Sequence, residues 1–181
     1  MKVTLTLDGK SVELDLTAEQ METLGLKEEE KKTGYEKVGR YKPYHYALPD
    51  GRIYFKYSDG TGFEDDLYDN ASYHSDKGLA EANARADRLM RQLRRFAAEN
   101  GGIPSLKDWA TNGETSSLFK MRTLYTICYD YANKSLIVGN SHYVRYSGAV
   151  YFNDYHTAKE AMELYRDELI WYFTEYEAML R

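Results

Sequence analysis

The alternation of apolar and polar residues predicts an α+β chain, and its clearest element is a helix within residues 75–102. Apolar side chains recur there every three or four residues and share one helical face: Leu79, Ala82, Ala86, Leu89, Leu93 and Phe96. Ser75 or Asp76 can cap the first turn, and Gly101 can end the helix. We therefore expect a long helix with one buried face.

At the start of the chain, apolar residues recur at every second position, as in a β-strand. Residues 3–7 and 12–16 alternate on either side of Asp8-Gly9, which is typical of a β-hairpin. Thr17 and Gln20 have the spacing of a capping box and predict a short helix that ends near Gly25. We expect residues 1–26 to form an N-terminal β-hairpin and short helix, and the charged residues 27–40 to form a linker.

In the rest of the chain, the same succession of elements, short strands followed by a helix, is predicted twice. Alternating runs at 44–48 and 53–57 precede an acidic loop at 63–70 and the helix described above. Short alternating runs at 124–131, 136–138, 143–146 and 150–152 precede a helix capped by Asn153 or Asp154, which extends to about Met179. The residues before the two helices match 78 positions apart, as Tyr73-His74-Ser75-Asp76 and Tyr151-Phe152-Asn153-Asp154. We predict two tandem antiparallel β-meander-plus-helix modules, 41–102 and 103–181.

Composition restricts the classes of partner. The formal net charge of −5 excludes a general affinity of the whole molecule for nucleic acid and favours basic or neutral partner surfaces. No run approaches the roughly 18 apolar residues of a membrane span. The single cysteine, Cys128, excludes an internal disulfide and suits a reducing cytoplasm. Tyrosine, at 18 of 181 residues, is common both in recognition surfaces and in strands.

The residue types that carry catalysis lack the required spacing. The four histidines form no His-x-x-x-His pair that could hold a metal: His45, His74, His142 and His156. Cys128 falls inside an apolar strand, where an inert thiol is expected. The turn at 59–62 is expected to join two strands, so it lacks the helix of a phosphate-binding loop. We predict no enzyme, no catalytic residue, no metal and no cofactor.

Two groups of residues are candidates for contact with a protein partner. The acidic loop, with Glu64, Asp65, Asp66 and Asp69, is either a solvated edge or a contact for a basic surface. On the C-terminal helix, Leu164, Glu168 and Trp171 fall outside the apolar stripe. This second group forms either the contact between the two modules or an anchor for a partner or a second copy.

The polar face of the 75–102 helix carries five arginines: Arg85, Arg88, Arg91, Arg94 and Arg95. Glu81 lies four residues before Arg85, and Asp87 four before Arg91, so these pairs can neutralise each other. Arg88, Arg94 and Arg95 have no such local acid. They either meet solvent or acids elsewhere in the chain, or bind phosphates or an acidic partner.

Several stretches together resemble small accessory proteins of phages and prophages of Gram-positive gut bacteria. In the first half these are Asp50-Gly51-Arg52-Ile53, Tyr73-His74-Ser75-Asp76, Ala80-Glu81 and Leu93-Arg94-Arg95-Phe96. In the second half they are Val150-Tyr151-Phe152, residues 158–161 and Asp167-Glu168-Leu169-Ile170-Trp171-Tyr172-Phe173. The resemblance covers the chain from Tyr41 onward and rests on turns, caps and core positions.

The resemblance implies a function in counter-defence, because proteins of this group include anti-CRISPR inhibitors of type II effector nucleases. Such inhibitors are small, acidic, non-enzymatic binders that cover the DNA-contacting surfaces of the nuclease. We therefore expect a phage-encoded protein of the host cytoplasm that binds a type II effector through its acidic loop and C-terminal helix. The alternative is a nucleic-acid-binding accessory protein that uses Arg88, Arg94 and Arg95, and a homodimer is compatible with both.

Overall fold

The computed structural model describes residues 2–7, 10–24, 32–104, 123–141, 145–146 and 148–180. The chain divides into two compact units, Met1–Thr33 and Gly34–Arg181. Helices and antiparallel strands occur together, which confirms the α+β class. The unit boundary falls inside the predicted linker 27–40, and the two predicted modules lie within the second unit.

The first unit contains the predicted hairpin and short helix. Strands β1 (Lys2–Leu7) and β2 (Lys10–Asp15) pair antiparallel, and α1 (Ala18–Thr23) follows. The capping box is formed: Thr17 N donates to Gln20 Oε1 at 2.9 Å, and Gln20 N donates to Thr17 Oγ1 at 3.3 Å. The sequence prediction for residues 10–24 is therefore confirmed in its local detail.

The second unit begins with an antiparallel hairpin of β3 (Pro43–Ala47) and β4 (Ile53–Tyr57). The next element is helix α2 (Gly62–Asp69), so the prediction of an acidic loop at 63–70 is wrong. The turn at 59–62 accordingly leads into a helix and does not join two strands. The acidic residues Glu64 and Asp65 lie in the first turn of α2, where negative charge stabilises a helix. A prediction based on the alternation of apolar and polar residues does not take this effect into account.

The later sheet has three strands: β5 (Leu124–Asp130), β6 (Ser135–Ser141) and β7 (Tyr151–Phe152). Their order is β6-β5-β7, so β7 returns to the free edge of β5. A meander would instead place each new strand beside the preceding one. Of the strand predicted at 143–146, residues 143–144 lie outside the described residues, and Arg145 and Tyr146 are not in a strand.

The two matched motifs have the same structural role. In each half of the second unit, the first hairpin strand also pairs with the residues just before the helix: His45 with His74, and Tyr125 with Phe152. The tyrosine of each motif is buried, and its hydroxyl accepts a backbone N–H. Tyr73 accepts from Val38 at 2.9 Å, and Tyr151 accepts from Tyr146 at 2.8 Å. The repeated sequence therefore encodes a repeated arrangement of strand edge and helix start.

An aspartate caps each of the two following helices. Asp76 caps α3 (Lys77–Glu99) by accepting from Leu79 N at 2.7 Å, and Asp154 caps α4 (Tyr155–Leu164) by accepting from Thr157 N at 2.8 Å. The predicted continuous C-terminal helix is interrupted at Tyr165. It continues as α5 (Arg166–Trp171), the π-helix η2 (Tyr172–Tyr176) and α6 (Glu177–Met179).

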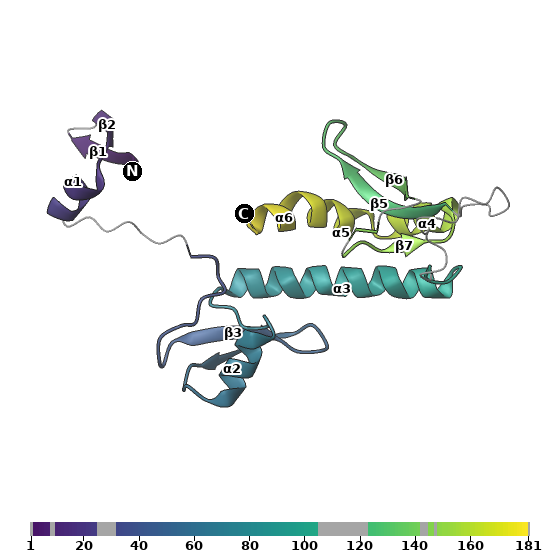
Figure 1. Ribbon diagram of the computed structural model, residues 1–181, viewed down its shortest axis with the longest axis horizontal. Helices are drawn as coiled ribbons and strands as arrows, with labels where there is room; N and C mark the ends of the chain where they lie inside the picture. The colour runs from purple at the N-terminus through teal and green to yellow at the C-terminus, as the bar shows by residue number, and fades with distance from the viewer. Residues whose placement is uncertain are drawn as a thin grey trace, which may run out of the picture. The chain divides into compact units, whose positions relative to one another are not determined.

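Helix α3 is shared by both halves of the second unit. Figure 1 shows it running between the β3–α2 part and the part that contains β5–β7 and the C-terminal helices. Its residues Leu89, Leu93 and Ala97 belong to one core with Ile127, Phe152 and Leu169. Near its start α3 also contacts β3 and β4. The helix therefore packs against elements of both halves of the second unit.

Candidate functional site

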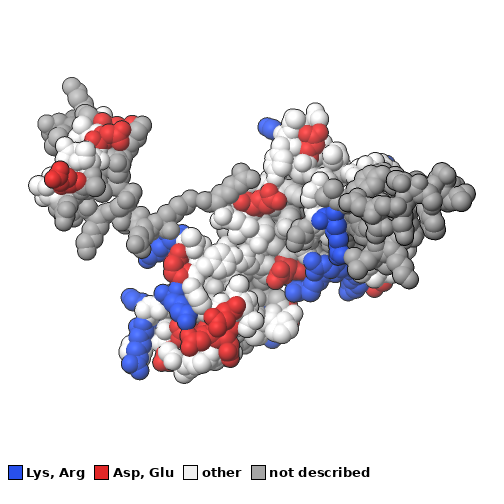
Figure 2. Space-filling view, in the orientation of Figure 1, with Lys and Arg blue, Asp and Glu red and all other residues white. Residues whose placement is uncertain are grey.

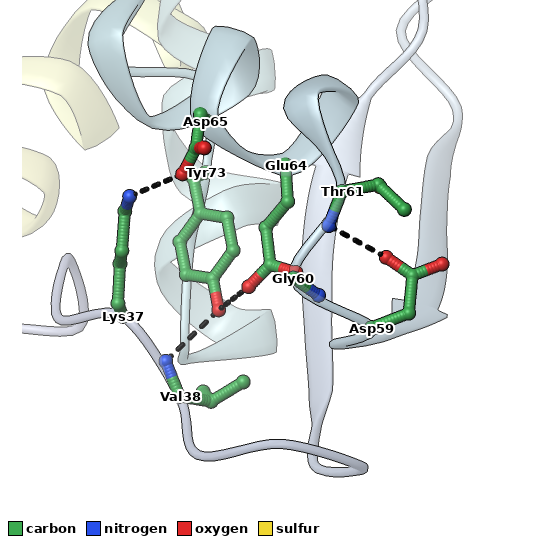
Figure 3. A network of polar contacts seen from close by, with 8 residues as sticks. All are labelled: Lys37, Val38, Asp59, Gly60, Thr61, Glu64, Asp65 and Tyr73. Atoms are coloured by element: carbon green, nitrogen blue, oxygen red, sulfur yellow. Dashed lines mark hydrogen bonds and ion pairs between the residues drawn. The ribbon is translucent and has the colours of Figure 1, made fainter.

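The carboxylates of α2 have different environments, and Glu64 is the buried one. Only 4% of Glu64 is exposed. Its carboxylate accepts from Gly60 N at 3.2 Å and from the hydroxyl of Tyr73 at 3.5 Å, as Figure 3 shows. Burial, together with the charge of Glu64, raises the pKa of the neighbouring Tyr44 hydroxyl to about 12. Glu64 thus fastens α2 to the hairpin and is not available to a partner, contrary to its predicted role.

Asp65 is exposed but already paired. Lys37 Nζ lies 2.6 Å from its carboxylate, and the same ammonium lies 4.6 Å from the centre of the Tyr68 ring. The hydrogen bond that Lys37 donates to Asp65 raises the pKa of Lys37. Because both side chains remain well exposed, solvent screens the pair and it contributes little to stability. A partner can therefore compete for Asp65 at small cost.

Asp66 and Asp69 are exposed and have no ion pair within the described part of the chain. Two exposed aromatic rings of the same helix accompany them, Phe63 at 46% and Tyr68 at 42%. We call this set, Phe63, Asp65, Asp66, Tyr68 and Asp69, the α2 surface. Figure 2 shows acidic side chains gathered over the α2 part of the second unit, with Lys and Arg beside them. An acidic surface with exposed rings suits contact with a basic protein surface.

One of the three C-terminal candidates belongs to the interior. Trp171 is 9% exposed and packs against Ala82 and Ala86 of α3, which contradicts its prediction as an exposed anchor. Trp171 lies outside the apolar stripe, and it is buried because α3 covers this second face of the C-terminal helix. The alternative interpretation, contact between the two halves, agrees with the structure. Leu164 is 63% exposed and remains available.

Glu168 forms a bidentate ion pair with Arg85 of α3. Its two carboxylate oxygens accept from Arg85 Nε at 2.8 Å and Arg85 Nη2 at 3.1 Å. The Arg85 guanidinium also lies 3.9 Å from the centre of the Trp171 ring. Hydrogen bonding by Arg85 lowers the pKa of Glu168. A partner that used Glu168 would compete with this pair, and the role of Glu168 as a partner contact stays a prediction.

The remaining arginines of α3 are exposed. Glu81 pairs with Lys77 at 3.1 Å, although the sequence pattern favoured Arg85. Arg95 lies 3.9 Å from Glu99, a local acid that the sequence analysis missed. Arg88 and Arg94 have no ion pair among the residues that the structure describes. Arg91 is likewise exposed and has no ion pair there, so the predicted pairing with Asp87 is not formed, and the positive charge available to a ligand is concentrated at Arg88, Arg91 and Arg94.

A buried polar network is a feature that the sequence analysis missed. The Asn83 amide donates to the Tyr35 hydroxyl at 2.7 Å and lies 2.7 Å from His74 Nε2. The Asn83 carbonyl oxygen accepts from the Tyr176 hydroxyl at 2.9 Å. The network ties the segment before β3 to α3 and η2. The sequence contained a feature that could have indicated this network, because Asn83 interrupts a run of alanines on the buried side of the helix.

We expect the network to make stability depend on pH. His74 is 3% exposed, and burial lowers its pKa below the ordinary 6.5. The unfolded chain binds a proton near pH 6.5 while folded His74 stays neutral, so the free energy of unfolding falls as the pH drops through that value. The fall is at most about 1.4 kcal/mol for each pH unit. Urea unfolding at neutral and mildly acidic pH measures it.

The control for this pH dependence is His74→Phe, which introduces the residue found at the equivalent position 152. Its free energy of unfolding should decrease less between the two pH values than that of the wild type. Equal decreases in both proteins would show that other groups carry the dependence.

Chemical groups for catalysis or metal binding do not converge in the described ranges. No three His, Cys, Asp or Glu side chains come together there as possible metal ligands. Burial raises the pKa of the Cys128 thiol, which disfavours the reactive thiolate. Among the described helices, none is both long and apolar enough to cross a membrane. The α2 surface and the exposed arginines of α3 are therefore the candidate functional features.

No known protein family, curated protein or solved structure matches this chain. The proposals below accordingly rest on the arrangement of its own residues and on the sequence resemblance.

Proposed function

We propose that this protein acts by stoichiometric binding to a basic protein surface, and most specifically that it inhibits a type II CRISPR effector nuclease. The observation that supports this is the α2 surface, where Asp66 and Asp69 lack an ion pair within the described residues. A lysine or arginine of a partner can meet them without breaking an internal contact. Phe63 and Tyr68 add exposed apolar area beside these charges.

The spacing of the carboxylates suits a surface that normally binds phosphates. Asp65 and Asp69 are one helical turn apart, which separates their Cβ atoms by roughly 5–6 Å. A type II effector holds its guide–target duplex in a positively charged channel. Successive carboxylates on a rigid helix can occupy part of such a channel in place of nucleic acid. Because Glu64 and Tyr73 anchor α2, little ordering of the helix is needed on binding.

Charge reversal on α2 is the decisive experiment. The double variant Asp66→Lys, Asp69→Lys should bind an immobilised, guide-loaded type II nuclease at least about 100-fold more weakly than the wild type, since each charge contributes roughly tenfold. The matched control is Glu13→Lys, Glu19→Lys, which makes the same charge change at exposed positions of the first unit. Its affinity should stay within about threefold of the wild type.

Two outcomes contradict the proposal in different ways. If the wild type is not retained by the nuclease at micromolar concentration, the proposed target is wrong. If both double variants lose affinity equally, the binding depends on overall charge and the α2 surface is not the site. Circular dichroism of each variant establishes that α2 and the rest of the fold are intact.

The second candidate function is nucleic-acid binding through α3. It is supported by the exposure of Arg88, Arg94 and Arg95, of which only Arg95 has an acid near it in the described chain. Exposed guanidinium groups along one helix can contact successive phosphates. This function requires an affinity that falls steeply with salt, and salt-independent binding would contradict it.

A further inference from the structure

A shallow, open groove lies between the β3–β4 turn and the first half of α3. It encloses about 570 Å³, which is within the usual range for small-ligand sites. The hairpin contributes Gly51, Arg52, Ile53 and Tyr54, and the helix contributes Lys77, Glu81, Ala84, Arg85 and Arg88. Four cationic side chains thus face one acidic side chain. The sequence analysis did not bring Arg52 and Lys77 together with the arginines.

Three of the four cations are held by acids of the same unit. Arg85 is fixed by Glu168 and by the Trp171 ring, and Lys77 pairs with Glu81 at 3.1 Å. Arg52 is held through its Nε, which donates to Asp50 at 2.7 Å. These pairs offset most of the local positive charge, although those of Arg52 and Lys77 are well exposed and screened by solvent. The groove therefore carries only a small excess of positive charge.

Arg88 supplies that excess. It is exposed and has no ion pair in the described part of the chain. Its Nη1 lies 3.9 Å from the position that a Cβ at Gly51 would occupy, so the guanidinium reaches across to the hairpin turn. The turn itself is rigid, because Gly51 N donates to Leu48 O and Arg52 N donates to Asp50. Arg52 and Arg88 thus face the same space from opposite walls.

An exposed aromatic ring and apolar side chains complete the groove. Tyr54 is 48% exposed and has Tyr46 as its cross-strand neighbour, with ring centres 6.4 Å apart. Ile53 and Ala84 provide apolar surface beside it. Guanidinium groups bind phosphate through paired hydrogen bonds, and an exposed tyrosine ring stacks on bases of any sequence. The combination matches one nucleotide.

We infer that this groove binds a nucleotide unit, with its phosphate between Arg52 and Arg88 and its base against Tyr54. The inference deepens the second candidate function and rests on it, and it is independent of the α2 surface. In this inference, nucleic acid binds at one site made of named residues and not along the whole row of arginines on α3. Such a unit comes either from a single-stranded nucleic acid or from a free nucleotide, and two probes separate these sources.

The test uses the full chain and a short fluorescein-labelled oligothymidylate, followed by anisotropy at several salt concentrations. Arg88→Glu should weaken binding at least about tenfold and reduce the slope of log affinity against log salt by about 0.7, the value for one phosphate contact on a single strand. Arg88→Gln should also weaken binding of the oligothymidylate, but by a smaller factor. Tyr54→Leu should weaken binding about tenfold without changing the slope.

Arg94→Glu is the matched control, because it makes the same charge change on the same helix outside the groove. Its affinity should change less than about threefold, since exposed charges away from a site have small effects. Unlabelled thymidine monophosphate is the second probe. If it displaces the oligonucleotide, a free nucleotide suffices for the site; if it does not, and the Arg88 and Tyr54 effects persist, the site requires a strand.

Two results overturn the inference, and they are distinguishable from each other. Equal losses in Arg88→Glu and Arg94→Glu would show diffuse binding along α3, which removes the groove but keeps the second candidate function. Failure of the wild type to bind the oligonucleotide at low salt would remove both. Neither result bears on nuclease binding through α2.

Discussion

Replacing Trp171 by alanine is expected to lower the free energy of unfolding by about 3–5 kcal/mol. The indole is 9% exposed and fills the space between α5 and α3, against Ala82 and Ala86. Its loss leaves a cavity, because neither alanine can extend to fill it. It also removes the ring on which the Arg85 guanidinium lies. Urea unfolding followed by far-UV circular dichroism measures the change.

Leu164→Ala is the control for Trp171→Ala. The sequence analysis placed both residues outside the apolar stripe, but Leu164 is 63% exposed whereas Trp171 is buried. Its replacement should change the free energy of unfolding by no more than about 0.5 kcal/mol. A small effect of Trp171→Ala on stability, combined with loss of a partner or of a dimer, would contradict the interior position of the ring.

Replacing Phe152 by alanine is expected to cost about 3–5 kcal/mol and to weaken both halves of the second unit together. Phe152 is 1% exposed, pairs with β5 and belongs to the core that includes Leu89 and Leu93 of α3. Because α3 also contacts β3 and β4, loosening its later half should loosen the first hairpin. Hydrogen exchange of the His45 amide, which donates to His74 O at 2.8 Å, reports on that hairpin.

Phe55→Ala is the matched control, since it deletes the same side chain from an exposed position. Phe55 is 59% exposed on β4, so its replacement should cost less than about 1 kcal/mol. If Phe152→Ala leaves exchange of the His45 amide unchanged, the two halves unfold independently and behave as separate modules.

The sequence predicted the elements whose signals are local. The apolar stripe of α3, the aspartate caps, the capping box of the first unit and the β3–β4 turn each depend on residues a few positions apart. The matched motifs at 73–76 and 151–154 were also readable, because they repeat one local arrangement. Propensity, pattern and capping agree at these places, which makes such elements predictable.

The errors arose where one element changes the surroundings of another. Trp171 lies outside the apolar stripe of its own helix and is buried because α3 covers that face, a contact that the periodicity of a single helix does not predict. Helix α2 was missed because its acidic residues suggested a solvated loop, whereas Glu64 turns inward to Tyr73 and Gly60. The groove required the hairpin turn to be placed beside α3, which is a long-range contact.

The burial of α3 on two sides determines where the chain can be divided. A fragment ending at residue 102 would retain the β3–β4 hairpin, α2 and α3 but lose the partners of Leu89, Leu93 and Ala97. Those side chains would then form an apolar strip along the helix, of the kind that drives association between molecules. Dissection of this protein for expression or for fusion should therefore keep Gly34–Arg181 together, with the earlier junction near residue 33 as the natural cut.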